Sequence, residues 1–138
     1  REKARRIACA SNLKQIGLAI RMYSQEHSEN FMNMPGGVAS SSAAAHYEML
    51  RSGGYLETVK VYMCPSSVNP LPEGTYISRT DYTYTGGLSE ASSVDSGVAQ
   101  DQNMNHSKYG NILFIDGHVQ GYAGSQWRNN NGSCQVYY

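Results

Sequence analysis

Charged residues and long apolar runs are both scarce in this sequence. Only 16% of its 138 residues are charged, and eleven Lys and Arg are balanced by eleven Asp and Glu. A chain without net charge has no long-range field to attract nucleic acid, so nucleic acid is not an expected partner. No apolar stretch approaches the roughly 18 residues that a membrane span requires, so any membrane anchor is expected upstream of residue 1.

Aromatic residues other than tyrosine are also scarce. Two Phe and one Trp stand against eleven Tyr, and fourteen Gly accompany many Ser and Asn. This mixture favours loops and half-buried β surface over helices. Since the length fits one domain with a core of its own, the composition predicts a single, loop-rich, extracytoplasmic α+β domain over residues 1–138.

The main helical signal runs from Ala4 to about His27. Apolar residues recur there at spacings of four, three, four and three, which places them on one helix face: Cys9, Leu13, Ile16, Ile20 and Tyr23. We expect this long helix to be the element against which the rest of the chain packs. The opposite face carries polar and charged residues and is expected to be wet: Arg5, Asn12, Lys14 and Arg21.

The start of this helix is unusual. Arg1–Arg6 contains four cations and one anion, whereas the helix dipole favours anions in the first turn. Two explanations stay open. The native helix continues upstream of the sequence, or the chain begins with an ordinary basic, frayed terminus.

Weaker signals predict the other elements. Ser40–Ser42 is expected to cap a short helix of about residues 42–52, which Gly53-Gly54 ends. Sheet and loops then occupy residues 55–138, and Ser66–Asn105 is expected to be a long excursion of loops. Short strands are predicted at Val59–Cys64 and Asp81–Thr85, and an edge strand or a frayed tail at Gln135–Tyr138.

A β-hairpin is predicted near the C-terminus. Strand formers fill Asn111–Ile115, and alternation resumes over His118–Tyr122. Asp116-Gly117 between them is expected to be a two-residue turn, because both residues tolerate positive φ. Apolar residues point to both faces of the first strand, which therefore is expected to be central in its sheet.

Several motifs in order along the chain resemble bacterial prepilin-type proteins, relatives of type II secretion pseudopilins and type IV pilins. His106, nine intervening residues and Asp116-Gly117 are similar to the His-x9-Asp-Gly signature of that family. Four further segments are similar to family motifs: Cys9–Gly17 with the later Tyr23, Cys64-Pro65-Ser66, Tyr82–Gly86 and Phe114–Val119.

The resemblance implies a fold, a location and a function. Members have a short basic leader and about 20 apolar residues that form the first half of one long helix. A prepilin peptidase removes the leader and methylates the new N-terminus. The implied fold is pilin-like, and the implied function is a non-enzymatic structural subunit of a type II secretion or type IV pilus-like envelope machine. The soluble domain would be periplasmic or extracellular, anchored in the inner membrane, with other pilin-like subunits as partners.

Cysteine spacing suggests one disulfide. Cys9 lies on the apolar helix face and Cys64 ends a predicted strand that would cross it, so a Cys9–Cys64 bond is predicted, with Cys134 free or at the surface. The alternative is that Cys9 and Cys64 are small buried hydrophobes.

Residues with catalytic or metal-binding side chains are few. His106, Asp116 and His118 are of types that bind zinc or transfer protons, but their spacing fits no metal site, and no nucleophile motif is present. We therefore expect no enzyme and no cofactor, with Asp116 shaping the turn. Because the resemblance extends to calcium-binding major pseudopilins, calcium is kept as an expectation, with Asp95 and Asp101 as the nearest loop carboxylates.

The abundant tyrosines leave a second function open. Together with Trp127, they would suit an extracytoplasmic surface module that binds a glycan or a protein through Tyr-rich loops. Filling of a half-exposed sheet is the structural alternative. The tyrosines concerned are Tyr47, Tyr55, Tyr62, Tyr76, Tyr82, Tyr84, Tyr109 and Tyr122.

Overall fold

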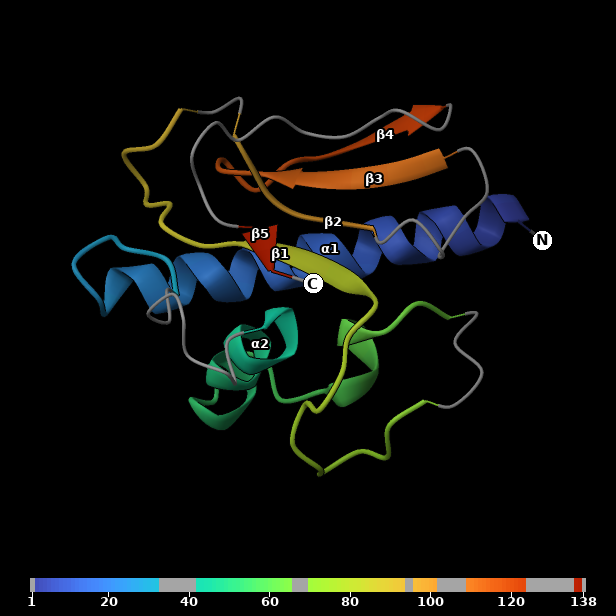
Figure 1. Ribbon diagram of the computed structural model, residues 1–138, viewed down its shortest axis with the longest axis horizontal. Helices are drawn as coiled ribbons and strands as arrows, with labels where there is room; N and C mark the ends of the chain where they lie inside the picture. Colours follow the sequence, from blue (N-terminus) through green and yellow to red (C-terminus); the bar gives the residue numbers. More distant parts are fainter. Residues whose placement is uncertain are drawn as a thin grey trace.

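A long helix packed on an antiparallel sheet defines the architecture (Figure 1). The computed structural model describes residues 2–32, 42–65, 70–93, 96–101, 109–123 and 136–137. Helix α1 (Glu2–Gln25) runs along one face of the sheet, while α2 (Ala43–Ser52) and the 3-10 helix η1 (Val59–Tyr62) pack beside it. The predicted α+β fold with a long N-terminal helix is confirmed. None of the described helices has the length and apolar content needed to span a bilayer.

All the described strand pairs in the sheet are antiparallel. The order is β4-β3-β2-β1-β5, with β5 on the edge beside β1. The strands are β1 (Tyr82–Thr85), β2 (Gly97–Asp101), β3 (Tyr109–Phe114), β4 (Val119–Ala123) and β5 (Val136–Tyr137). Of the two alternatives for the end of the chain, the edge strand is confirmed by β5. The strand predicted at Asp81–Thr85 is confirmed by β1.

The core lies between α1 and the sheet. The apolar stripe of α1 is at most 2% exposed at Cys9, Leu13, Ile16, Ala19 and Ile20. The helix approaches β3 so closely that a Cβ on Gly17 would lie 2.7 Å from the Leu113 side chain. On β3, Ile112, Leu113 and Phe114 are all buried, and strands pair on both sides of it. The prediction of a doubly buried inner strand is confirmed.

The two helices begin and end near their predicted residues. In α2, the Ser42 hydroxyl accepts a hydrogen bond from Ala45 N at 3.1 Å, as expected of an N-cap. Helix α1 ends without a glycine. Instead, Ser28 and Glu29 adopt positive φ values of 56° and 66°, and Glu29 N donates to Ser24 O.

The strand predicted at Val59–Cys64 is wrong, because Val59–Tyr62 forms η1. The first two N–H groups of this turn, on Val59 and Lys60, donate to the Glu73 carboxylate at 2.8 and 3.0 Å. Backbone donors that a strand would pair with a neighbour are thus satisfied by a side chain. The alternation of buried and exposed residues at its start fits either conformation.

The expected loop excursion Ser66–Asn105 contains a strand that the sequence analysis missed. Strand β2 pairs with β1 through Tyr82↔Asp101 and with β3 through Ala99↔Leu113. Its residues, Gly-Val-Ala-Gln-Asp, are mostly not strong strand formers. Pairing on both sides therefore decides its conformation.

The predicted hairpin is confirmed, but its turn is longer than expected. Leu113 pairs with Val119, and Gly117 N donates to Phe114 O at 2.9 Å, so three residues form the turn: Ile115, Asp116 and Gly117. Among them only Gly117 has a positive φ, of 91°. This is the arrangement of a type I turn followed by a left-handed glycine, a common three-residue hairpin loop.

Candidate functional site

The turn of the signature segment docks on α1. Asp116 Oδ1 accepts a hydrogen bond from His118 N at 3.1 Å and also pairs with His118 Nδ1. These hydrogen bonds hold the pKa of the Asp116 carboxyl below its usual range. From α1, Arg21 donates to the backbone oxygen of Asp116 at 3.1 Å. The geometry is that of a carboxylate shaping its own turn, as the sequence predicted.

Arg21 also connects this turn to the chain beyond β1. Its Nε lies 3.8 Å from Glu90 Oε1, and Ser24 donates to the other Glu90 oxygen at 2.6 Å. Glu90 N in turn donates to Glu29 O. These contacts hold the hairpin turn and Glu90 against the C-terminal end of α1. They are structural, and nothing in them resembles a nucleophile with an orienting base.

Metal-binding candidates do not converge. In the described residues, no three His, Cys, Asp or Glu side chains lie close enough to hold a metal ion. Asp95, His106, Trp127 and Cys134, all named by the sequence analysis, lie outside the described residues.

Asp101 is not a loop carboxylate, so that part of the calcium expectation is wrong. It lies in β2, is 1% exposed, and its Oδ2 accepts hydrogen bonds from Asn111 N and Asn111 Nδ2, both at 2.9 Å. Asn111 Nδ2 also donates to Arg6 O at 3.2 Å. This buried Asp101–Asn111 pair joins β2, β3 and α1. Its one signal in the sequence is a lone Asn at the start of an apolar strand, which does not predict a carboxylate partner.

The two cysteines predicted to pair are in contact. The sulfur atoms of Cys9 and Cys64 lie 3.2 Å apart, and both residues are at most 3% exposed. The hydrogen bond with Cys64, together with burial, raises the pKa of the Cys9 thiol far above its usual value. Burial and this contact therefore disfavour the thiolate form of Cys9 in the folded protein.

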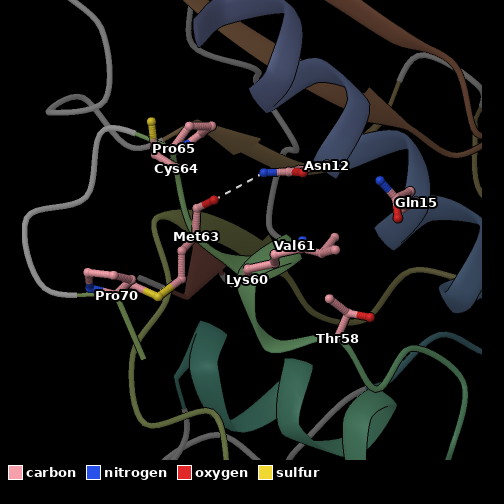
Figure 2. Close-up of a pocket in the computed structure, with 9 residues that line it drawn as sticks. All are labelled: Asn12, Gln15, Thr58, Lys60, Val61, Met63, Cys64, Pro65 and Pro70. Atoms are coloured by element: carbon pink, nitrogen blue, oxygen red, sulfur yellow. Dashed lines mark hydrogen bonds between the residues drawn. The ribbon is translucent and has the colours of Figure 1, made fainter. Parts of the chain in front are cut away.

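A cavity of about 420 Å³ lies next to Cys64 (Figure 2). On one side α1 contributes Asn12, whose Nδ2 donates to Met63 O at 3.0 Å. Among the described residues that line it, Lys60 is the one charged residue, and none is a His, Asp or Glu. The residues are Asn12, Gln15, Thr58, Lys60, Val61, Met63, Cys64, Pro65 and Pro70.

Half of the tyrosines considered for a binding platform belong to the core. Tyr47, Tyr62, Tyr82 and Tyr84 are 0% exposed. Three of their hydroxyls donate to backbone oxygens at 2.7 Å, namely those of Thr83, Leu56 and Met32. These rings cannot stack on a sugar in solution. Tyr76, at 66% exposed, and Tyr122, at 36%, remain at the surface.

The outer face of α1 is not uniformly polar, contrary to expectation. Ile7 and Leu18 are each 62% exposed and Met22 is 51% exposed. Their spacings of eleven and four residues place them within about 60° of one another around the helix. We call these three residues the outer stripe. Lys14 and Arg21, both exposed, flank it.

Comparison with known proteins adds a partial family match. A family model described as a protein of unknown function (DUF1559) matches residues 1–47, which span α1 and the beginning of α2. No curated protein and no solved structure matches the chain.

Proposed function

We propose that this chain is the envelope domain of a pilin-like subunit that serves a secretion or pilus-like machine by assembling with other subunits. The observation that carries the proposal is α1, a 24-residue helix buried along one face by the sheet and exposed along the other. The match over residues 1–47 is consistent with this emphasis on α1, because the part of the chain that a known family shares contains the whole of this helix.

The outer stripe supplies a contact surface for such an assembly. Leu18 and Met22, one turn apart on this stripe, keep more than half of their surface exposed in the described part of the chain. Apolar side chains aligned on one helix face are what helix-to-helix packing between subunits uses. The proposed partners are therefore other pilin-like subunits, which pack against this face.

The proposed role is structural rather than enzymatic. The clearest polar contacts of the described residues, at the hairpin turn and at Asp101–Asn111, hold elements together. In the proposal an apolar helix precedes residue 1 and anchors the protein in the inner membrane, with this domain in the periplasm or outside the cell.

The test is the N-terminus of the native protein purified from bacterial envelopes. N-terminal sequencing and intact mass should find a methylated residue followed by about 20 apolar residues that run into Arg1. In a strain that lacks its prepilin peptidase, the leader should remain and the methyl group should be missing. A conventional secretion signal cleaved just before Arg1 would overturn the proposal.

A further inference from the structure

A second cavity, of about 370 Å³, lies between the first turns of α1 and the strands β3 and β4. We call it the α1 cavity. Two cations and several apolar groups line it together, which is the composition of a site for an amphiphilic anion. The lining residues are Lys3, Arg6, Ile7, Ala10, Tyr109, Asn111, Val119 and Gly121.

Arg6 is held in position by an aromatic ring. Its guanidinium carbon lies 4.2 Å from the centroid of Tyr109. The Tyr109 ring lies across Gly121. A Cβ added to Gly121 would lie 1.8 Å from the Tyr109 hydroxyl, so a glycine at this position is needed for the ring to lie there. An arginine stacked on a fixed ring keeps its planar donors pre-organised, which lowers the entropy lost on binding a phosphate.

Within the part of the chain that the structure describes, no acidic side chain neutralises the positive charge of this cavity. Within the described residues, neither Lys3 nor Arg6 forms an ion pair, and the buried Nε of Arg6 has no hydrogen-bond partner. The nearby Asp101 does not line the cavity, and its Oδ2 accepts from Asn111. Glu2 pairs with Arg5 at 3.3 Å. An anion in the cavity would meet two cations that no acidic side chain of the described residues pairs.

We infer that the α1 cavity binds the phosphate of a phospholipid headgroup. Arg6 and Lys3 bind the phosphate oxygens, while Ile7 and Val119 contact the glycerol and the first acyl carbons. The inference rests on the proposed function, which places this end of α1 beside the membrane. Ile7, which is 62% exposed at the cavity, favours a lipid over a fully hydrated phosphate.

Anchoring explains how a chain of zero net charge can use such a site. The chain has no long-range field, yet α1 alone carries five cations and one anion. A membrane anchor preceding residue 1 would hold the cavity at a high effective concentration of headgroups, so modest intrinsic affinity suffices. The bound headgroup would then fix how the domain sits on the membrane surface.

Vesicle co-flotation of the 138-residue chain tests this inference. The wild type should bind phosphatidylglycerol vesicles, and Arg6→Gln should lower the partition constant about tenfold, the loss of one hydrogen bond to a charged group. Lys3→Gln should also weaken binding. Lys14→Gln is the matched control, because it removes the same charge from an exposed position outside the cavity, and it should have the smaller effect. Circular dichroism verifies that each variant is folded.

Three results would overturn the inference. Equal losses for Arg6→Gln and Lys14→Gln would indicate diffuse attraction to the vesicle rather than a site. Binding of inorganic phosphate or glycerol 3-phosphate, followed by NMR, as tightly as vesicles would assign the cavity to a free phosphate. Absence of binding to vesicles at about millimolar accessible lipid, the effective concentration that a short tether supplies, would exclude the lipid. The proposed assembly function is tested separately. If the native N-terminus is methylated but no vesicle binding is found, the lipid inference is wrong and the assembly function is still supported.

Discussion

The sulfur atoms of Cys9 and Cys64 lie 3.2 Å apart in the core, although 55 residues separate them in the chain. A disulfide needs about 2.05 Å between the sulfurs, so a small shift of the two side chains would close the bond. Closure would tie α1 to the segment that follows η1, beside the cavity of Figure 2. The disulfide itself remains a prediction.

We predict that refolding of the unfolded chain in oxidised glutathione converts these thiols to a disulfide, with the glutathione disulfide taking up the two electrons and two protons. In a Cys134→Ser background, the oxidised protein should lose two hydrogen atoms in intact mass and resist alkylation. It should be about 4 kcal/mol more stable than the reduced form, the loop-closure contribution for this separation. If Cys9 and Cys64 can both still be alkylated after the chain has been unfolded and then refolded with the oxidant, the prediction is wrong.

Gly117 should be required for the length of the hairpin turn. Its φ of 91° is costly for a residue with a Cβ, so Gly117→Ala should lower the free energy of unfolding by about 1–2 kcal/mol in urea titrations. Gly117→Asn is the matched control and should lose less, because asparagine tolerates this region better. Equal losses for both variants would point to a cause other than backbone strain.

The elements that the sequence predicted are those whose signals are local. The apolar stripe of α1, the Ser42 cap and the hairpin each depend on residues within a few positions of one another. The missed elements depend on distant partners. The first N–H groups of η1 are bound by the distant Glu73, and β2 is held by pairing on both sides. Residue propensity and hydrophobic periodicity, which are local, therefore do not predict either element.

The same distinction holds for the candidate sites. Contact between Cys9 and Cys64 was predicted from the apolar stripe of α1, which is confirmed at Cys9, and from a strand ending at Cys64, where the structure has η1 instead. The α1 cavity was not, because Arg6 and Asn111 meet across 105 residues of sequence. Nor did the pattern show that Tyr84 is buried, since tyrosine suits a core and a binding surface equally well.

Tyr84 should act in folding rather than in ligand binding. Its hydroxyl donates to Met32 O at 2.7 Å inside the core, so Tyr84→Phe leaves a buried carbonyl without this donor. We expect a loss of about 1–3 kcal/mol in the free energy of unfolding. Tyr76→Phe, at a residue that is 66% exposed, is the control and should change stability by less than about 0.5 kcal/mol. A neutral Tyr84→Phe would contradict the structural role.

His46 should make the fold sensitive to mild acid. It is 0% exposed, and burial lowers the pKa of its imidazole below the ordinary value. Below a pH of about 6.5 the unfolded chain therefore binds a proton that the folded state resists, and stability falls as pH falls through that range. Urea titrations between pH 7.5 and pH 5.5 should show this decline, and NMR should show His46 neutral where free histidine is charged. A His46 that titrates like free histidine would contradict it.

The outer stripe of α1 should be required for assembly and dispensable for folding. Leu18 is 62% exposed, so Leu18→Glu should change the free energy of unfolding by less than about 0.5 kcal/mol. In the membrane-anchored native protein, the same change should abolish cross-linking between subunits, because a carboxylate buried in a helix contact lacks a partner. Gln120→Glu, exposed on β4, adds the same charge away from α1 and should leave cross-linking intact. If Leu18→Glu subunits cross-link as the wild type does, a surface other than the outer stripe mediates assembly. The proposed contact face would then be wrong.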